Sequence, residues 1–527
     1  MINILYNGHI YRDVLDQKPV SALAISSDKI VAYGSDEEIL DRFPSPNSKI
    51  NLEDRTVLPG LIDSHIHLSQ YGLSLQRVDC ETETLLQCLD RVKSKSKTLP
   101  PDSWLLGHGW NQNSWGGRFG TKTLLDEIDD QHPIFLTAKS LHAAWCNSKA
   151  LQIANISATT PDPDGGSIQM DERGDPTGIL FESAMELVKR VIPPPTQAEL
   201  TAALQHAQNE LNRSGITGAH DFDQMDCFSS LEDLLENDEL NLRVVKGLPI
   251  AYLDEALELG IHSGFGAPLL RFGTVKLFSD GALGPQTAAM LQPYESTIDS
   301  GLLLMDEAEI LDIGKKALQG RFPLSIHAIG DRANRVVINS MNALNLYAKQ
   351  QHLPVLRNRI EHLQLIAPSD LELLRGSGIV ASMQPYHMIS DQQMADRQWG
   401  KRCEFSYAWR SIADTGTILA FGSDTPVESP NPFASIYAAA TRLPAGYNHP
   451  EGWYPAQKIG LREAFKGFTT GAAYAAGMET KAGKLHEGYY ADLIVLNEDP
   501  FSNPPINLPV VKTSATMVGG RWVWKGF

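Results

Sequence analysis

Two histidines separated by one residue are the first side chains whose spacing suits metal chemistry. His65 and His67 end the segment TVLPGLIDSHIH, which begins as an apolar run. On an extended strand, residues two apart project from the same face, so both imidazoles can reach one cation. The arrangement suits zinc, which binds histidine nitrogens at about 2.0–2.1 Å. Alone the pair is weak evidence, because HxH also arises by chance, and a surface histidine pair is the alternative.

Four further residues extend this pair into a set. They are Lys276 in VKLFSDG, His327 in LSIHAIGD, His362 in RIEHLQ and Asp424 in AFGSDTP. Each stands at the C-terminal end of a different predicted strand, which is the face of a parallel barrel where active sites are built. The set therefore predicts a metal site. The alternatives are a salt bridge at the barrel mouth for the lysine and a turn cap for the aspartate.

The middle of the chain alternates apolar runs with amphipathic helical stretches, a pattern typical of βα units around a parallel sheet. This predicts an α/β fold with a (β/α)8 TIM-like barrel. The candidate strands are TVLPGLIDSH, ITGAHDF, LRVVKGLPI, FGTVKLFS, FPLSIHAI, RIEHLQLI, IVASMQPY and ILAFGSD.

The rest of the chain predicts two additions to the barrel. Residues 1–56 and 484–527 contain short alternating runs separated by turns, which predict a small β-sandwich domain formed by both termini. The barrel is predicted over 57–68 and 196–483. Residues 69–195 do not fit the βα repeat and end at the proline cluster VIPPPTQ, so we expect an inserted subdomain after strand 1.

Composition and net charge restrict the kinds of binding partner that we expect for this chain. The formal charge of -18 would repel a phosphate backbone and an anionic lipid surface, so we expect neither nucleic-acid nor membrane partners. The five cysteines are scattered without a CxxC pair, which argues against a disulfide framework and a thiolate zinc cluster. No signal peptide or long apolar run is visible, which predicts a cytoplasmic protein. We expect a small-molecule substrate, and a homodimer is one of the oligomeric states left open.

The chain resembles the amidohydrolase superfamily in PGLIDSHIHL, VKLFSDGALG, HAIGDRA, RIEHLQ, FGSDTPV and TTGAAYAAGMETKAGKLHEGYYADLIVL. Within it, the chain is similar to the YtcJ-like and AepA-like branch, which includes N-substituted formamide deformylases. The likeness runs over essentially the whole chain. It implies the barrel with its terminal sandwich, and one or two divalent metal ions such as zinc. The ligands that it implies are His65, His67, His327, His362 and Asp424, with Lys276 as a carbamylated residue bridging two ions.

The catalytic roles follow from this site. Asp424 would take a proton from the attacking water and pass it to the leaving amine, with His327 and His362 beside it. A carbamylated Lys276 would be an anionic oxygen ligand, which is the state that we expect. An unmodified Lys276 would instead bind a substrate anion or a carboxylate.

Several residues are weaker candidates for contact with substrate. Arg332 could hold a substrate carboxylate, although the Asp331-Arg332 pair is more often a structural ion pair. Glu361 precedes a predicted ligand and should point away from the metal on a strand, which favours a structural role or support of a metal ligand. Ordinary packing is the alternative for the aromatic candidates. The full predicted set is Trp110, His142, His220, Asp280 and Arg332.

The leading prediction is a hydrolase that cleaves a C–N bond in a small amide, formamide, carbamate or cyclic amide. Deaminases of the superfamily usually have a glutamate three residues after the fifth-strand histidine, whereas His327 is followed by Ala328, Ile329 and Gly330. A deaminase is therefore the weaker alternative. A non-catalytic regulatory protein is the other, but a pure binding pocket has no need of Asp424. Where relatives commonly have an arginine after the lysine motif, this chain has Gln286, so their substrate preference cannot be transferred.

Overall fold

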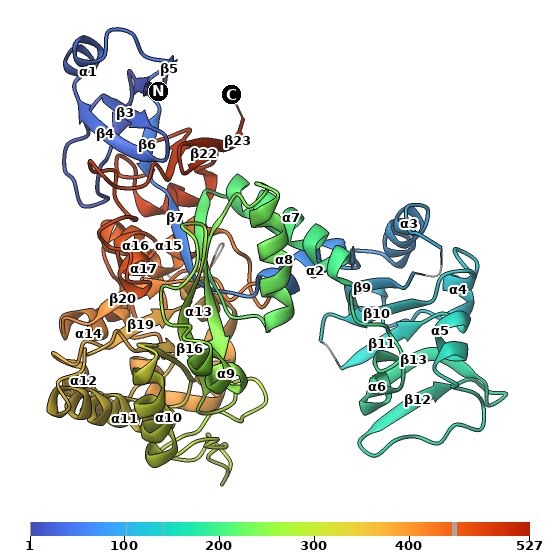
Figure 1. The fold of residues 1–527 in the computed structure, drawn as a ribbon. Coiled ribbons are helices and arrows are strands. Elements are labelled where there is room, and N and C mark those ends of the chain that lie inside the picture. The colour runs from blue at the N-terminus through green and yellow to red at the C-terminus, as the bar shows by residue number, and fades with distance from the viewer. Residues whose placement is uncertain (1, 102, 141, 445–450, 527) are drawn as a thin grey trace. The chain divides into compact units, whose positions relative to one another are not determined.

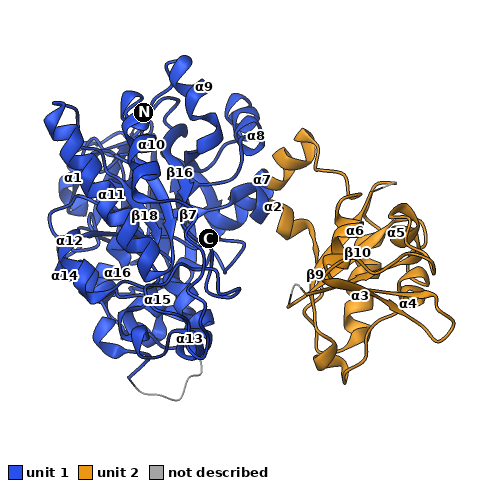
Figure 2. Ribbon diagram, turned by 90° about the horizontal axis from the view of Figure 1, so that it is seen from below, with its two compact units in different colours: residues 1–71, 204–527 blue, residues 72–203 orange. Residues whose placement is uncertain are grey.

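An eight-stranded, all-parallel sheet forms the centre of the larger of two compact units, which comprises residues 1–71 and 204–527 (Figure 2). The structure is a computed structural model, and it describes residues 2–101, 103–140, 142–444 and 451–526. Its strands are labelled in Figure 1 where room allows. In sheet order they are β7 (Leu61–Ile66), β14 (Ile216–Asp221), β15 (Arg243–Pro249), β16 (Leu270–Phe278), β17 (Leu324–Ala328), β18 (Arg359–His362), β19 (Val380–Met383) and β20 (Ile418–Phe421). The predicted (β/α)8 barrel is thereby confirmed.

The first predicted strand divides into two. Thr56–Pro59 is β6, which pairs in a different sheet, and the barrel strand β7 begins after Gly60. Pro59 has no N–H for a ladder, and a Cβ at position 60 would lie 2.2 Å from Thr217 Oγ1. A glycine is therefore required where the chain passes close to β14 and enters the barrel.

The barrel closes between its first and last strands. The Asp63 carboxylate on β7 accepts hydrogen bonds from the Ser423 amide at 3.0 Å and the Ser423 hydroxyl at 2.6 Å. One residue further along, the Asp424 amide donates to the His65 carbonyl at 2.7 Å. These bonds satisfy buried polar groups at the seam where no continuous strand ladder is present.

Helices connect the barrel strands, and local sequence explains where several begin. Asp306 caps α10 by accepting from the amides of Ala308 and Glu309, and the Glu309 side chain completes the capping box. The helices of this unit are α1 (Asp36–Arg42), α8 (Met225–Glu236), α9 (Leu253–Glu258), α10 (Glu307–Gln319), α11 (Asp331–Gln350), α12 (Leu371–Leu374), α13 (Pro385–Trp399), α14 (Trp409–Asp414), α15 (Pro432–Thr441), α16 (Leu461–Gly467) and α17 (Thr470–Ala475), and α2 (Leu68–Gln76) and α7 (Gln197–Arg213) connect it to the smaller unit.

Two small sheets are built from the chain ends, beside which Figure 1 marks both termini. They share one hydrophobic cluster, to which Leu23 and Ile25 contribute from the first sheet and Val57, Leu493 and Val495 from the second. The first contains β4 (Lys29–Gly34), β3 (Ala22–Ser26), β1 (Ile2–Tyr6) and β5 (Ser48–Asn51), and the second contains β2 (His9–Ile10), β6, β21 (Leu493–Leu496), β22 (Thr513–Val518) and β23 (Arg521–Lys525).

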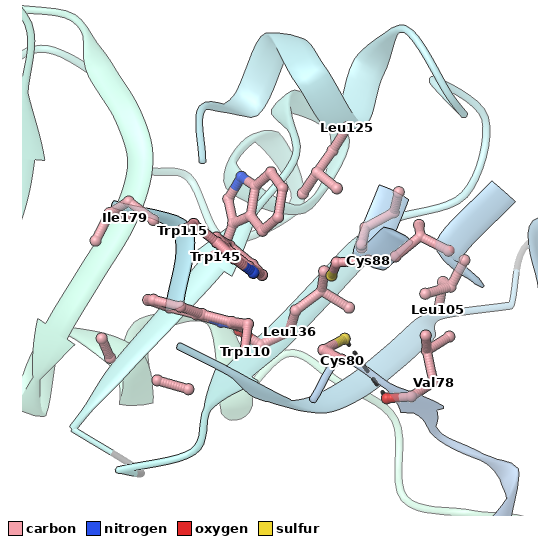
Figure 3. Packing of buried hydrophobic residues seen from close by; sticks show 14 residues of the cluster. Val78, Cys80, Cys88, Leu105, Trp110, Trp115, Leu125, Leu136, Trp145 and Ile179 are labelled. Carbon is pink, nitrogen blue, oxygen red and sulfur yellow. Dashed lines mark hydrogen bonds between the residues drawn. The ribbon is translucent and has the colours of Figure 1, made fainter. Parts of the chain in front are cut away.

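The smaller unit, residues 72–203, has its own sheet and core. Its core includes Trp115, Leu136 and Trp145, which pack together in Figure 3. The strands in sheet order are β12 (Gly166–Met170), β13 (Pro176–Glu182), β11 (Ala143–Cys146), β10 (Ile134–Ala138), β9 (Leu105–Trp110) and β8 (Val78–Asp79), and the helices within the unit are α3 (Leu85–Ser96), α4 (Lys122–Asp126), α5 (Ser148–Ile153) and α6 (Glu186–Lys189). Across all described residues, no helix combines the length and apolar character needed to span a membrane.

Candidate metal centre

The predicted ligands come together at the C-terminal ends of the barrel strands. The rings of His65 and His362 lie 4.9 Å apart, and those of His327 and His362 lie 4.6 Å apart. Each residue comes from a different part of the barrel: His65 from β7, His67 from directly after it, Lys276 from β16, His327 from β17, His362 from the end of β18 and Asp424 from directly after β20.

Asp424 lies against both histidines of the HxH pair. Its Oδ1 is 3.3 Å from His67 Nε2 and 3.6 Å from His65 Nε2. The other ring nitrogens contact carboxylates, with His65 Nδ1 2.7 Å from Glu361 Oε2 and His67 Nδ1 3.2 Å from Asp223 Oδ1. Because a carboxylate only accepts, each Nδ1 donates, and each Nε2 is left to face Asp424. The two tautomers are thus set as metal ligation requires.

In His362 and His327, too, one ring nitrogen contacts a protein acceptor and the other is left for a ligand. The Gln384 side-chain oxygen lies 2.8 Å from His362 Nδ1, which leaves Nε2 for a ligand. The Gly281 carbonyl lies 2.9 Å from His327 Nε2, which leaves Nδ1 instead. In each ring, one nitrogen is occupied by a protein acceptor and the other can bind a cation.

Backbone strain accompanies two of these positions. His362 and Asp424 have φ values of 75° and 60°, in the left-handed region that L-residues seldom occupy. The strand β18 ends at His362 for this reason, and its ring turns toward His65 and His327. Such strain concentrates at functional sites, where the surrounding structure holds it in place.

Glu361 contacts His65 at Nδ1, the ring nitrogen that does not face Asp424, as support of a predicted ligand requires. Its Oε2 meets His65 Nδ1, and both its oxygens accept from Arg359, at 2.6 Å and 3.0 Å. Glu361 and Arg359 are both almost fully buried, so this ion pair holds the His65 ring from inside the barrel.

His387 is a neighbour of the site that the sequence prediction missed. It lies in the first turn of α13, and its Nε2 is 3.6 Å from Asp424 Oδ2. Its ring is nearly parallel to that of His362, at 8° and 6.2 Å. Within the described part of the chain, this Nε2 is buried and has no hydrogen-bond partner. In the sequence, His387 ends the segment QPYH close to a predicted strand, and this position could have indicated a site residue.

Lys276 lies in an apolar environment beside these groups. Its amine is 4.9 Å from the ring centres of both Phe222 and Phe278. Its Nζ is buried and makes no hydrogen bond to any described residue. Burial lowers the pKa of this amine to about 8. An unpaired buried amine is costly, so the site needs a further group next to it.

The charges at the site favour a cation. Burial and the nearby Lys276 lower the pKa of His65 to about 4, so this ring is neutral at pH 7. Burial alone would lower the pKa of His67, but hydrogen bonds with Asp223 and Asp424 raise it to about 9. The Asp424 carboxyl has a pKa well below its ordinary value, since the neighbouring histidines outweigh the effect of burial. The proton on His67 therefore occupies a position that a metal ion would take.

The residues present fit a divalent cation. One ligand atom from each of His65, His67 and Asp424 lies within 4.8 Å of the others, and the same holds for His362, His387 and Asp424. Imidazole nitrogens with a carboxylate oxygen are a donor set that zinc accepts. Lys276 Nζ and His387 Nε2 are both buried without a hydrogen-bond partner among the described residues, so each can contact a group bound here.

Comparison with known proteins assigns this architecture to a family. A family model described as the amidohydrolase family matches residues 49–524, which is most of the chain. The chain belongs to the amidohydrolase family. This agrees with the predicted superfamily, and it places the histidine and aspartate cluster in a family named for hydrolysis.

Individual relatives of this amidohydrolase span its full length. The protein YtcJ of Bacillus subtilis is 30% identical over 535 residues, which cover 99% of each chain. N-substituted formamide deformylase of Arthrobacter pascens is 25% identical over 535 residues, which cover 95% of this chain and 94% of its own. A solved structure of an uncharacterised metal-dependent hydrolase of Pyrococcus furiosus has a TM-score of 0.79 at 28% identity, with 95% of this chain and 100% of its own covered. The predicted YtcJ-like branch is confirmed, and the protein is a metal-dependent hydrolase of this family.

Three of the predicted substrate contacts of the amidohydrolase lie in its barrel unit. Asp280 is buried and accepts from the amides of Ala289, Ile329 and Gly330, at 2.8 to 3.0 Å. Arg332 is exposed on the first turn of α11. His220 is buried at the end of β14 and accepts from Arg359 at 2.7 Å. Their contact with substrate stays a prediction.

The other two predicted contacts lie in the smaller unit of the amidohydrolase. Trp110 belongs to the core shown in Figure 3, and its indole donates to the Leu136 carbonyl at 2.8 Å. His142 is exposed and pairs with Glu182 at 3.0 Å. These contacts account for both side chains within their own unit, and a role toward substrate stays a prediction.

Proposed function

We propose that this metal-dependent hydrolase cleaves a C–N bond in a small amide, formamide, carbamate or cyclic amide. The ligands of one or two zinc ions would be His65, His67, Lys276, His327, His362 and Asp424. The observation that supports the proposal most is the position of Asp424, whose carboxylate lies 3.3 Å from His67 Nε2 and 3.6 Å from His65 Nε2. The likeness to an N-substituted formamide deformylase over 95% of the chain supports the bond type.

Different groups would carry out different steps of the hydrolysis. When bound, a divalent cation supplies Lewis-acid polarisation of a carbonyl oxygen and makes water more acidic. Asp424 accepts the proton of the attacking water at a carboxylate oxygen and returns it to the leaving nitrogen. Its low pKa keeps it ionised for the first of these steps. His387, beside the same carboxylate, would donate a hydrogen bond to the substrate or to Asp424.

Lys276 would act as a carbamate. The neutral amine attacks CO₂, a C–N bond forms, and one proton leaves to solvent. Burial lowers the pKa of the amine to about 8, so a larger fraction is neutral at pH 7 than for an ordinary lysine. The product oxygen atoms would supply the anionic group that this apolar position lacks.

Other functions receive less support. Deamination needs a proton carrier close to the ring nitrogen, and Ala328, Ile329 and Gly330 after His327 offer no carboxylate. A purely regulatory binding protein would not need Asp424 in contact with two imidazoles. A cytoplasmic location, a small-molecule substrate, a homodimer and the lack of nucleic-acid or membrane partners stay predictions.

A substrate screen tests the proposal. The zinc-loaded protein is offered panels of small amides, N-substituted formamides, carbamates and lactams, with an ester panel and an aminopyrimidine panel as controls. We expect release of amine or ring opening in the C–N panels. Turnover confined to aminopyrimidines would favour the deaminase, and turnover confined to esters would contradict a C–N hydrolase. No turnover in any panel would favour the regulatory protein.

A further inference from the structure

A cavity of about 380 Å³ lies among the N-terminal ends of the barrel strands and extends inward to Phe222, whose ring lies 4.5 Å from that of His65. Several of its lining residues lie at the N-terminal ends of barrel strands: Arg271 is the second residue of β16, Pro323 immediately precedes β17 and Arg357 lies two residues before β18. The proposed metal ligands, in contrast, lie toward or directly after the C-terminal ends of strands. The cavity is therefore a separate site, which we name the basal arginine cavity and define by Arg271, Arg321, Arg357 and Arg359.

The lining of this cavity carries positive charge in a chain that is strongly acidic overall. All four of these residues are arginines, and none of the described residues that line the cavity has a carboxylate. Glu479 neutralises Arg357 from outside the lining, through a bidentate ion pair. Glu361 neutralises Arg359 from the barrel interior. Arg271 and Arg321 have no ion pair of this kind among the described residues.

Arg271 has unmet hydrogen-bonding capacity. Its Nη2 donates to the Ala476 carbonyl, but its Nε is buried and has no partner among the residues that the structure describes. Burial lowers the pKa of this guanidinium, and the nearby Arg243 lowers it further. A half-buried guanidinium with an unpaired buried N–H is destabilising, and an anion in the cavity that accepts from this N–H would reduce that cost.

We propose that the basal arginine cavity binds a small organic anion through its carboxylate or phosphate group. Arginine matches both groups because its planar N–H donors can form two parallel hydrogen bonds to them. The volume falls within the range of about 300–1,000 Å³ that is common for small-molecule sites. The apolar lining, from Val245, Val355 and Leu356, would cover the carbon part of the ligand.

The cavity is joined to the metal centre by buried hydrogen bonds. Arg359 and His220 both line the cavity, and Arg359 donates to His220 at 2.7 Å. The same guanidinium holds Glu361, which contacts His65 at 2.7 Å. An anion that contacts Arg359 would thus contact the guanidinium that holds Glu361. Glu361 in turn orients the predicted metal ligand His65. The binding site itself does not depend on the proposed C–N hydrolysis.

Calorimetric titration tests the proposal with defined probes. Sodium succinate and sodium sulfate are titrated into the zinc-loaded full-length protein, and uncharged succinamide serves as the matched control. We expect at least one of the two anions to bind and succinamide not to bind. Absence of binding by both anions at up to about 10 mM would overturn the proposal, since two arginines without ion pairs should give at least millimolar affinity.

Variants locate the bound probe. Arg271→Met and Arg321→Met should each weaken binding by roughly tenfold to a hundredfold, the effect of losing one charge-assisted hydrogen bond. Arg375→Met removes an exposed charge that pairs with Glu372 on α12, and should leave the affinity within about twofold. Arg321 is exposed, so its variant remains informative if Arg271→Met fails to fold. Equal affinity in all three variants would place the probe elsewhere, the metal centre included, and would refute the site.

Discussion

The backbone amide of Asp424 donates a 2.7 Å hydrogen bond to the carbonyl of His65. This bond joins the last barrel strand to the first. It also fixes the Asp424 carboxylate 3.6 Å from the His65 imidazole. The contact that closes the barrel therefore also positions the Asp424 carboxylate in the site. A side-chain substitution at Asp424 can test the chemistry without removing this backbone hydrogen bond.

Asp424→Asn should keep the fold and remove most turnover. The amide has the same size and keeps an oxygen for a ligand, but it cannot accept the proton of the attacking water. Loss of such a proton carrier costs about 10²–10⁴-fold in rate. Steady-state kinetics on the best substrate from the screen measure this, with metal content followed by elemental analysis. Asp414→Asn, at the exposed end of α14, is the control, and near-normal turnover in Asp424→Asn would exclude the proton-transfer role.

Zinc affinity should rise with pH between about 7 and 9. The metal-free His67 has its pKa raised to about 9, and only the neutral ring binds a metal, so zinc must displace one proton below that pH. Affinity then increases about tenfold per pH unit and becomes constant above pH 9. Competition with a chromophoric chelator at several pH values gives the slope. His67→Asn should lower the slope by about one and the exposed His352→Asn should not, whereas equal slopes would show that His67 is not a ligand.

Glu361→Gln should destabilise the barrel unit. The substitution leaves Arg359, which is 1% exposed, without its counter-charge. Breaking a buried ion pair on one side costs about 3–5 kcal/mol. Urea unfolding of the metal-free parent protein and variant measures the difference in their free energies of unfolding without a contribution from metal binding. Glu372→Gln removes an exposed partner of Arg375 and should change stability by less than about 1 kcal/mol, so similar losses in both variants would refute the role assigned to the buried pair.

Lys276 should carry CO₂ in the zinc-loaded protein. Incubation with ¹³C-bicarbonate should produce a carbamate resonance in the ¹³C spectrum, because the amine is buried and its pKa is lowered to about 8. The resonance should disappear in Lys276→Gln and persist in Lys315→Gln, which changes a lysine on α10 that pairs with Asp312. A zinc-loaded protein without the resonance, or with one that survives in Lys276→Gln, would show an unmodified lysine.

Much of the barrel could be predicted from apolar runs, because strands of a parallel sheet are buried on both faces and stand out from amphipathic helices. Two of the differences in detail have clear local causes. Gly60 must meet Thr217 closely, which divides the first run into β6 and β7. His362 and Leu363 adopt φ values of 75° and 43°, which end β18 well before the apolar run RIEHLQLI ends.

The site could be predicted only where its residues lie on strands or directly after them. His387 comes from the first turn of α13, so strand position gave no reason to include it. The tautomer-setting partners of His65 and His67, Glu361 and Asp223, depend on side-chain directions that spacing does not determine. The basal arginine cavity is invisible in sequence for a similar reason, since its arginines are scattered and meet only when the strands align.

The seam between β7 and β20 has a consequence for the order in which the protein matures during synthesis. His65 and His67 leave the ribosome early, whereas Ser423 and Asp424, which close the seam, emerge late. A nascent chain that ends before β20 has the two imidazoles but lacks the carboxylate that faces both of them. The complete set of proposed ligands is therefore assembled only when the last strand docks, which couples metal binding to the final step of barrel closure.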